Sequence, residues 1–162
     1  MSKDPVPGRI VPPKRPRSIP GVVTEIQTGC GSVFVTITVD EAGFPLEAFA
    51  AGMGACLEAS MAAVGRVTSI ALRCGVDPVI LSRHLMAVSC TSVAWDNGKA
   101  VPSCFAAIGQ AIQEVTEKAV AKAKNSVEAI AEIATPDDPE LQAAADEIEK
   151  LRAERERQGL NE

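Results

Sequence analysis

Four of the five cysteines in this sequence stand where predicted secondary-structure elements begin or end, and they are the residues best suited to chemistry. Cys56 and Cys104 come at the start of apolar helical segments, Cys30 lies between two glycines, and Cys90 follows a short helical segment. Unpaired N–H groups in the first turn of a helix favour a thiolate, which is the form that binds metals and attacks electrophiles. Metal binding and thiol redox chemistry are therefore the two chemistries to consider.

The spacing of these four cysteines does not by itself establish a site. Positions 30, 56, 90 and 104 are separated by 26, 34 and 14 residues, with no Cys-x-x-Cys pair of the kind that makes a zinc site recognisable. On spacing alone, small buried hydrophobic side chains are the simplest interpretation. The fifth cysteine, Cys74, fits that interpretation best because it ends an apolar helical stripe.

Length and composition predict one compact domain with tails. The chain has 162 residues and 46% hydrophobic content, which is enough for one core and too little for two full domains. There is no apolar run of about 18 residues and no apolar segment behind the N-terminal charges, so we expect a soluble, cytoplasmic protein. An odd number of cysteines at irregular spacing does not resemble a secreted disulfide framework, so the thiols are expected to be reduced or liganded.

Charge is unevenly distributed between the two ends of the chain. Residues 1–21 carry five basic side chains against Asp4 and hold six prolines, which predicts an extended basic arm. Its Lys14, Arg15 and Arg17 could touch phosphate or an acidic surface, but a solvated leader is the simpler expectation. Residues 135–162 carry nine acidic and four basic side chains. Without clustered cations on the folded part, nucleic-acid binding is not expected.

Alternating apolar residues predict a small antiparallel sheet between the two tails. Val33, Val35, Ile37 and Val39 share one face of a strand, and the turn 40–43 leads to a partner strand at 46–50. Residues 22–27 are predicted as the third strand. The expected fold class is therefore α+β, with about three strands packed against helices and an amphipathic helix at the C-terminus.

Three helices are predicted after the strands. The segment 56–74 is predicted as a helix ending at Gly75, and its buried stripe is expected to consist of Cys56, Ser60, Ala63, Val67, Ile70 and Cys74. Asp77 before Pro78 predicts the cap of a second helix to about Ala87. Ser103 is predicted to cap a third helix to about Ala134, with an interruption near Asn125 and Ser126.

Two further expectations concern single side chains and the C-terminus. Arg66 and Arg73 lie two helical turns apart, and a salt bridge with Glu47 or Glu58 is favoured over substrate binding. His84 is expected on a helix surface rather than in a Cys/His nucleophile pair. Residues 135–162 are predicted as an acidic helical tail whose apolar side chains need a surface to cover, which suggests a homodimer; they are Leu141, Ala144, Ala145, Ile148 and Leu151.

The sequence resembles a known family at several points. The segments "TGCGSVFVTITVDEAGFPLEAF" and "GACLEASMAAVGRVTSIALRCGVDP", then "SC" before a polar turn and "SCFAAI" after it, are similar to the TSCPD domain of ribonucleotide reductases, above all adenosylcobalamin-dependent ones. The resemblance covers about residues 17–113, and the predicted domain spans residues 22–134. The family's Pro and Asp after Ser-Cys are replaced by Phe105 and Ala106, so any function of that Asp is absent.

The resemblance implies an accessory or detached domain rather than a complete reductase. The cysteines that match the family pattern are Cys30, Cys56, Cys90 and Cys104, and the resemblance favours a four-cysteine site with Zn²⁺ as the default metal. An iron–sulfur cluster is an alternative. A catalytic barrel of several hundred residues has no room in this chain, nothing resembles a cobalamin site, and the implied partner is a ribonucleoside-diphosphate reductase catalytic subunit.

Two further hypotheses remain open at the sequence level. In the first, Cys90 and Cys104 form a dithiol that carries electrons to a reductase, with the polar turn at Asp96, Asn97 and Gly98 bringing them together. In the second, the chain is a protein-interaction module in which the cysteines are incidental and the arm and tail make the contacts.

Overall fold

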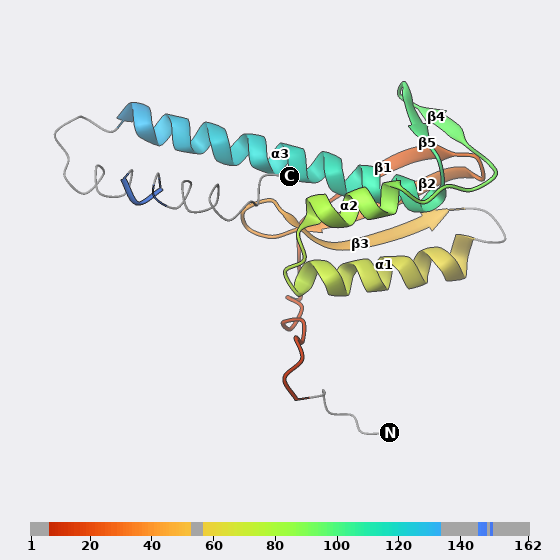
Figure 1. Ribbon diagram of the computed structural model, residues 1–162, viewed down its shortest axis with the longest axis horizontal. Coiled ribbons are helices and arrows are strands. Elements are labelled where there is room, and N and C mark those ends of the chain that lie inside the picture. The colour runs from red at the N-terminus through yellow and green to blue at the C-terminus, as the bar shows by residue number, and fades with distance from the viewer. Residues whose placement is uncertain (1–6, 53–56, 134–145, 149, 151–162) are drawn as a thin grey trace. The chain divides into compact units, whose positions relative to one another are not determined.

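The computed structural model describes residues 7–52, 57–133, 146–148 and 150 (Figure 1). The chain forms two compact units, Met1–Ala121 and Lys122–Glu162. In the second unit the description covers residues 122–133 of the last helix and a short helical stretch at 146–148. Most of the predicted tail helix, with Leu141, Ala144, Ala145 and Leu151, lies outside the described residues. Cys56 does too.

A three-stranded antiparallel sheet forms the body of the first unit, in the order β1 (Gly21–Thr28), β2 (Gly31–Val39), β3 (Pro45–Gly52). The predicted strands are confirmed, including the alternation on β2, where Val33, Val35 and Ile37 are buried. The predicted turn is confirmed as well: Asp40 Oδ1 accepts the Phe44 N–H at 2.8 Å, and Gly43 has a φ of +93°. A positive φ at this position suits glycine, because side chains clash there.

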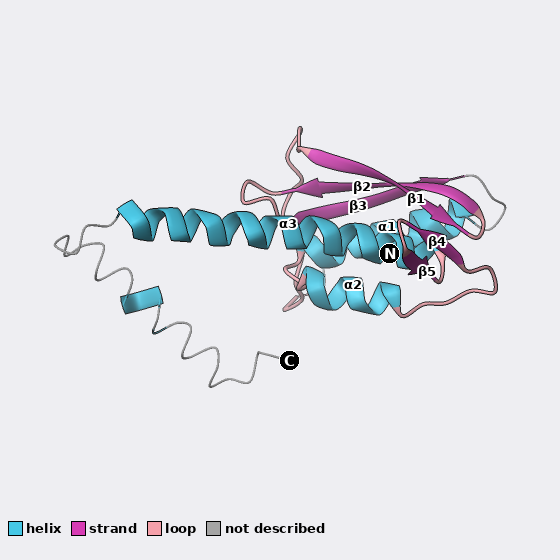
Figure 2. Ribbon diagram, turned by 90° about the horizontal axis from the view of Figure 1, so that it is seen from above, coloured by secondary structure: helices cyan, strands magenta, loops and turns pink. Residues whose placement is uncertain are grey.

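Helices α2 (Pro78–Met86) and the first part of α3 (Cys104–Ile133) lie on one face of this sheet (Figure 2), and α1 (Leu57–Arg73) runs along its β3 edge. The core is formed mainly between β2 and α3, whose Ile108 and Ile112 are fully buried in the same cluster as Val33, Val35 and Ile37. Helix α2 packs closely on α3, since a Cβ added at Gly109 would meet Ser82 O at 2.7 Å. The α+β fold class is therefore confirmed.

The predicted caps of α2 and α3 and the predicted end of α1 at Gly75 are also confirmed. Asp77 caps α2 by accepting the Val79 N–H at 2.7 Å, and Ser103 caps α3 by accepting the Ala106 N–H at 3.0 Å. Gly75 follows α1 with a φ of +85°. The predicted interruption of α3 is wrong, because the helix continues through Asn125 and Ser126. Among the described residues, no helix combines the length and the apolar character needed to cross a membrane.

Helix α1 buries a different face from the one its apolar stripe predicts. Val67 and Ile70 are 68% and 51% exposed, and Ser60 and Ala63 are also exposed. The buried positions are instead Met61, Gly65, Thr68, Ser69 and Leu72. The reason is close packing beside β3: a Cβ added at Gly65 would lie 3.0 Å from Ala48 O. Small and hydrogen-bonding residues therefore occupy the middle of the buried face, at Gly65, Thr68 and Ser69, and the larger Met61 and Leu72 lie towards its two ends.

A two-stranded hairpin, β4 (Ala94–Asp96) and β5 (Lys99–Val101), occupies the segment between Cys90 and Cys104. The sequence analysis identified its turn but not its strands. Asn97 and Gly98 both have positive φ, 47° and 77°, as the favoured two-residue hairpin turns require. The Asp96 carboxylate accepts the Gln27 N–H at 3.2 Å, which joins the hairpin to β1.

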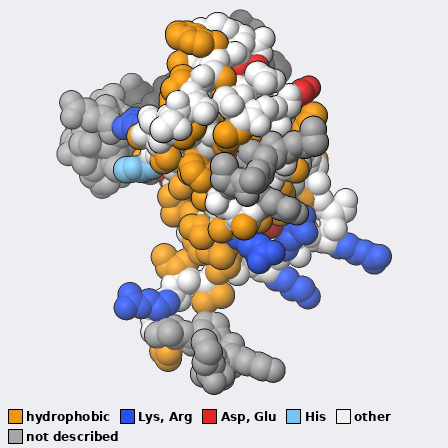
Figure 3. Space-filling model, turned by 90° about the vertical axis from the view of Figure 1, so that its right-hand side faces the viewer, with side chains coloured by type: hydrophobic (Ala, Val, Ile, Leu, Met, Phe, Trp, Pro, Cys, Tyr) orange, Lys and Arg blue, Asp and Glu red, His pale blue; other side chains and the backbone are white. Residues whose placement is uncertain are grey.

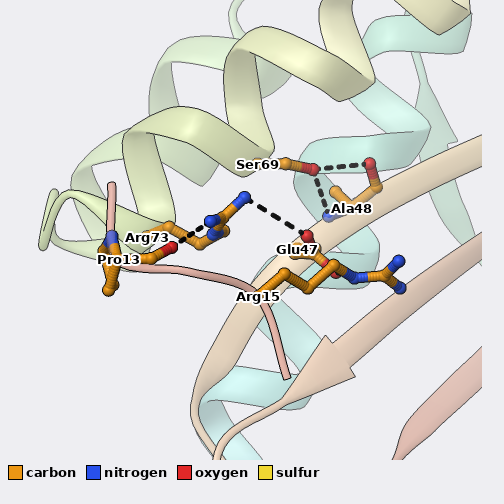
Figure 4. Close-up of polar contacts among 6 residues, drawn as sticks. All are labelled: Pro13, Arg15, Glu47, Ala48, Ser69 and Arg73. Atoms are coloured by element: carbon orange, nitrogen blue, oxygen red, sulfur yellow. Dashed lines mark hydrogen bonds and ion pairs between the residues drawn. The ribbon is translucent and has the colours of Figure 1, made fainter. Parts of the chain in front are cut away.

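The described part of the N-terminal arm docks on the domain instead of remaining a solvated leader. Arg15 Nε donates to Glu47 Oε2 at 2.7 Å (Figure 4). The Arg15 guanidinium also lies 5.8 Å from the centre of the Phe49 ring. Glu47 is buried and also faces Arg73 at 3.7 Å, which confirms the predicted Arg73–Glu47 salt bridge. The expectation failed at Arg15 because a buried carboxylate requires a cation, and the arm supplies one.

Candidate metal centre

The turn between β1 and β2 holds the first predicted ligand, Cys30. Its backbone N–H donates to Thr28 Oγ1 at 3.2 Å, and the same hydroxyl donates to Gly31 O at 2.7 Å. Thr28 is 3% exposed, so its hydroxyl organises the turn from inside the fold. Cys30 itself is half-buried and packs against the core.

Cys104 is the first residue of α3 and meets the same hydroxyl. Its Sγ lies 3.4 Å from Thr28 Oγ1, so Thr28 contacts both predicted ligands. The position of Cys104 is fixed by its neighbour Ser103, which is buried, caps the helix and donates to Val88 O at 2.6 Å. Cys104 is half-buried against the core cluster.

Cys90 lies at the start of the segment that leads to the hairpin. Its N–H donates to Pro102 O at 2.9 Å, and its Sγ donates to Ser92 O at 3.2 Å. Ser92 in turn packs directly on Gly29, where an added Cβ would lie 2.2 Å from Ser92 O. Only glycine fits at this position, and the close approach brings the Cys90 segment against the turn that holds Cys30.

Three of the four predicted ligands therefore lie at the same end of the sheet. Strand β3 also ends there, because its last residue, Gly52, pairs with Val33 near the start of β2. Cys56, between β3 and α1, lies outside the described residues. Within the described residues, no three His, Cys, Asp or Glu side chains form a group that could hold a metal ion. The three thiols are neighbours through Thr28, Gly29 and Ser92, but they do not converge on one point by themselves.

The other chemically capable residues lie elsewhere. Cys74 follows the last turn of α1 and is only half-buried, so it is less enclosed than its predicted core role implies. His84 is exposed in the last turn of α2, which confirms its predicted place on a helix surface.

A hollow of about 450 Å³ lies between β1, the β4–β5 hairpin and α3, away from the cysteines. Several of its polar groups are already engaged: Gln110 donates to Ala100 O, Gln113 to Glu117, and Lys118 bonds Glu114. Since these groups satisfy one another, the hollow offers a weaker case for a site than the cysteines.

A comparison with models of protein families identifies the family of this chain. Residues 9–116 match the family model described as the TSCPD domain. The chain belongs to the TSCPD domain family. This match confirms the resemblance seen in the sequence segments, and it extends from the described arm into α3, so it includes all four predicted ligands and the Arg15–Glu47 pair.

Membership of the TSCPD domain family suggests an association with ribonucleotide reductase. No curated protein and no solved structure matches the chain.

Proposed function

We propose that this TSCPD domain is an accessory of ribonucleotide reduction in which Cys30, Cys56, Cys90 and Cys104 bind a structural Zn²⁺. The observation that carries the proposal is the Thr28 hydroxyl, which contacts the Cys104 Sγ at 3.4 Å and the Cys30 N–H at 3.2 Å. Residues 74 positions apart are thereby brought to one place. Four thiolates are a donor set that suits tetrahedral Zn²⁺.

The proposed ligands come from four separate segments: the β1–β2 turn, the connection from β3 to α1, the loop after α2 and the start of α3. When bound, zinc would cross-link these segments and contribute its binding free energy to folding, on the order of 10 kcal/mol for structural sites. A structural rather than catalytic role follows from the donor set, because a closed Cys₄ shell leaves no position for substrate.

Metal analysis of the full chain, purified without added zinc, tests the site. We expect about one equivalent of zinc, with four thiols protected from a thiol reagent in the native state. Cys30→Ser, Cys90→Ser and Cys104→Ser should each lose metal and stability, whereas Cys74→Ser is the matched control and should keep both. Free titration of all five thiols in folded, metal-free protein would exclude the proposed site.

A dithiol formed by Cys90 and Cys104 is the second candidate function. Two hydrogen bonds connect the ends of their loop: Cys90 N–H to Pro102 O at 2.9 Å and Ser103 Oγ to Val88 O at 2.6 Å. Mild oxidation with diamide would join the two sulfurs, each thiol losing one proton and one electron to the diamide. The two functions differ in outcome, because Ser substitution at either cysteine leaves a redox domain folded and a zinc domain destabilised.

The proposed association with a ribonucleoside-diphosphate reductase has its own test. Titration of the full chain into the catalytic subunit of the same organism's reductase, followed by calorimetry, should give saturable binding. The Cys74→Ser variant should bind equally well. A stable accessory complex should have a dissociation constant well below about 0.1 mM. If the two proteins are mixed at that concentration and neither binding heat nor co-elution is observed, the association is contradicted.

A further inference from the structure

The most apolar stripe of α1 faces away from the rest of its unit. It consists of Ala59, Ser60, Ala63, Val67 and Ile70, and all five are exposed. The residues repeat at helical spacing, so they form a continuous surface along the helix. Figure 3 shows one face of the molecule, on which hydrophobic side chains (orange) form a band with Lys and Arg side chains (blue) beside it.

The charge next to this stripe is basic. Arg66, directly before Val67, is exposed and makes no ion pair with any residue that the structure describes. An apolar stripe beside the exposed Arg66 fits a segment with the opposite charge, whereas a second α1 would bring Arg66 opposite another Arg66.

The chain itself contains a segment of that chemistry. Residues 141–151 place Leu141, Ala145, Ile148 and Leu151 at helical spacing, with acidic side chains at Asp146, Glu147 and Glu149. The part that the structure describes has this character: residues 146–148 are helical, Asp146 and Glu147 are exposed, and Ile148 is 45% exposed. Apolar residues recur at the same spacing in both sequences, which suits packing of this segment along α1.

We propose that the apolar stripe of α1 docks the acidic C-terminal segment, residues 141–151, of a second copy of this chain. A second copy is favoured by α3, whose described side chains from Val120 to Val127 are all exposed, so that Val120 and Val127 are left for another chain to cover. Exchange of segments between two chains would use the same contact twice.

Site-specific cross-linking in the full chain tests this docking. Benzoylphenylalanine replaces Val67, a position that tolerates a large side chain because it is 68% exposed. Unlabelled and ¹⁵N-labelled chains are mixed and irradiated, and the cross-linked peptides are mapped by mass spectrometry. We expect cross-links from position 67 to residues 141–151, in pairs that join a labelled to an unlabelled chain. The matched control is benzoylphenylalanine at Val23, 62% exposed on β1, which should not yield them.

Charge reversal supplies a second measurement. Arg66→Glu should lower the yield of the cross-link about twofold to fivefold, since exposed ion pairs contribute modestly. The loss should be greater at low than at high ionic strength. Cross-links confined to one isotope, cross-links from position 67 to a second α1, or no cross-links at all would each overturn the proposal. The metal content of the protein does not enter this test, so its failure is separate from failure of the zinc site.

Discussion

Ser69 on α1 supplies both hydrogen bonds that a fourth strand would give to Ala48 on β3. Its hydroxyl accepts the Ala48 N–H at 3.0 Å and donates to the Ala48 C=O at 3.1 Å (Figure 4). Strand β3 is an edge of the sheet, where unpaired backbone groups invite pairing with other chains. Helix α1 thus covers the edge, with Gly65 allowing the approach and Ser69 satisfying the backbone.

Replacement of Ser69 by Ala should therefore destabilise the fold. Both backbone groups of Ala48 are buried, and an unsatisfied buried group costs about 1–3 kcal/mol. We expect a loss in this range in urea unfolding of the full chain. The control is Ser60→Ala, because Ser60 is exposed on the same helix and should change stability by less than about 0.5 kcal/mol. Equal effects of the two substitutions would show that the edge contact adds nothing.

Removal of the Thr38 hydroxyl, on the same sheet, should not destabilise the fold, in contrast to removal of the Ser69 hydroxyl. Thr38 Oγ1 is the one buried side-chain oxygen or nitrogen without a hydrogen-bond partner in the described part of the chain. Thr38→Val removes this hydroxyl at nearly constant shape, so it should leave stability unchanged or raise it by about 1 kcal/mol. Thr116→Val is the matched control, because Thr116 Oγ1 donates to Ile112 O at 2.7 Å and its loss should destabilise. The interpretation fails if thermal unfolding shows Thr38→Val to be the more harmful change.

Local rules were sufficient for much of the fold. Alternation predicted the buried face of β2, and the caps at Asp77 and Ser103 were visible because capping depends on residues adjacent in sequence. The hairpin β4–β5 was missed although Asn97-Gly98 was a signal for it, because its strands have only three residues each. Short strands carry almost no periodicity.

Long-range packing accounts for what the sequence did not reveal. The apolar stripe of α1 predicted the wrong buried face, since periodicity identifies the most apolar side of a helix but not the side that fits against β3. The candidate site shows the same limit. Cys30, Cys90 and Cys104 could be chosen from the sequence because they stand at the ends of predicted helices and strands. The residues that connect them in space are Thr28, Gly29 and Ser92, and nothing in their residue types indicates such a role. Only the fold shows that these residues meet.

The pair of arginines around Glu47 predicts a non-additive effect. Arg15→Ala alone should cost about 1 kcal/mol or less, because the Arg15 side chain is 53% exposed and solvent screens the pair. Arg15→Ala combined with Arg73→Ala leaves a buried carboxylate with no cation, which should cost about 3–5 kcal/mol. Adding Glu47→Gln to the double variant should restore part of that loss. Urea unfolding of the parent, the two single variants, the double variant and the triple variant provides the comparison.

Two results would contradict this account of Glu47. If the effects of Arg15→Ala and Arg73→Ala simply add, the two arginines do not share one carboxylate. If Glu47→Gln lowers stability further in the double variant, the buried charge is not the source of the loss. A useful control is Lys118→Ala, which removes an exposed pair with Glu114 and should change stability by about 0.5 kcal/mol at most.

Ser103 connects the stability of α3 to the candidate metal centre. Its hydroxyl accepts the Ala106 N–H and donates to Val88 O, so Ser103→Ala removes a helix cap and leaves a carbonyl unsatisfied. We expect a loss of about 1–2 kcal/mol and faster reaction of Cys104 with a thiol reagent in the native state. Ser103→Asp keeps a capping acceptor without the donor to Val88, so its stability should lie between Ser103→Ala and the parent.

The control is Ser126→Ala. Ser126 is an exposed serine further along α3, and its substitution should alter neither stability nor thiol reactivity. If Cys104 reacts at the parent rate in Ser103→Ala despite the lost stability, then the cap does not hold the thiol in place, and the position of Cys104 depends on Thr28 and the core instead.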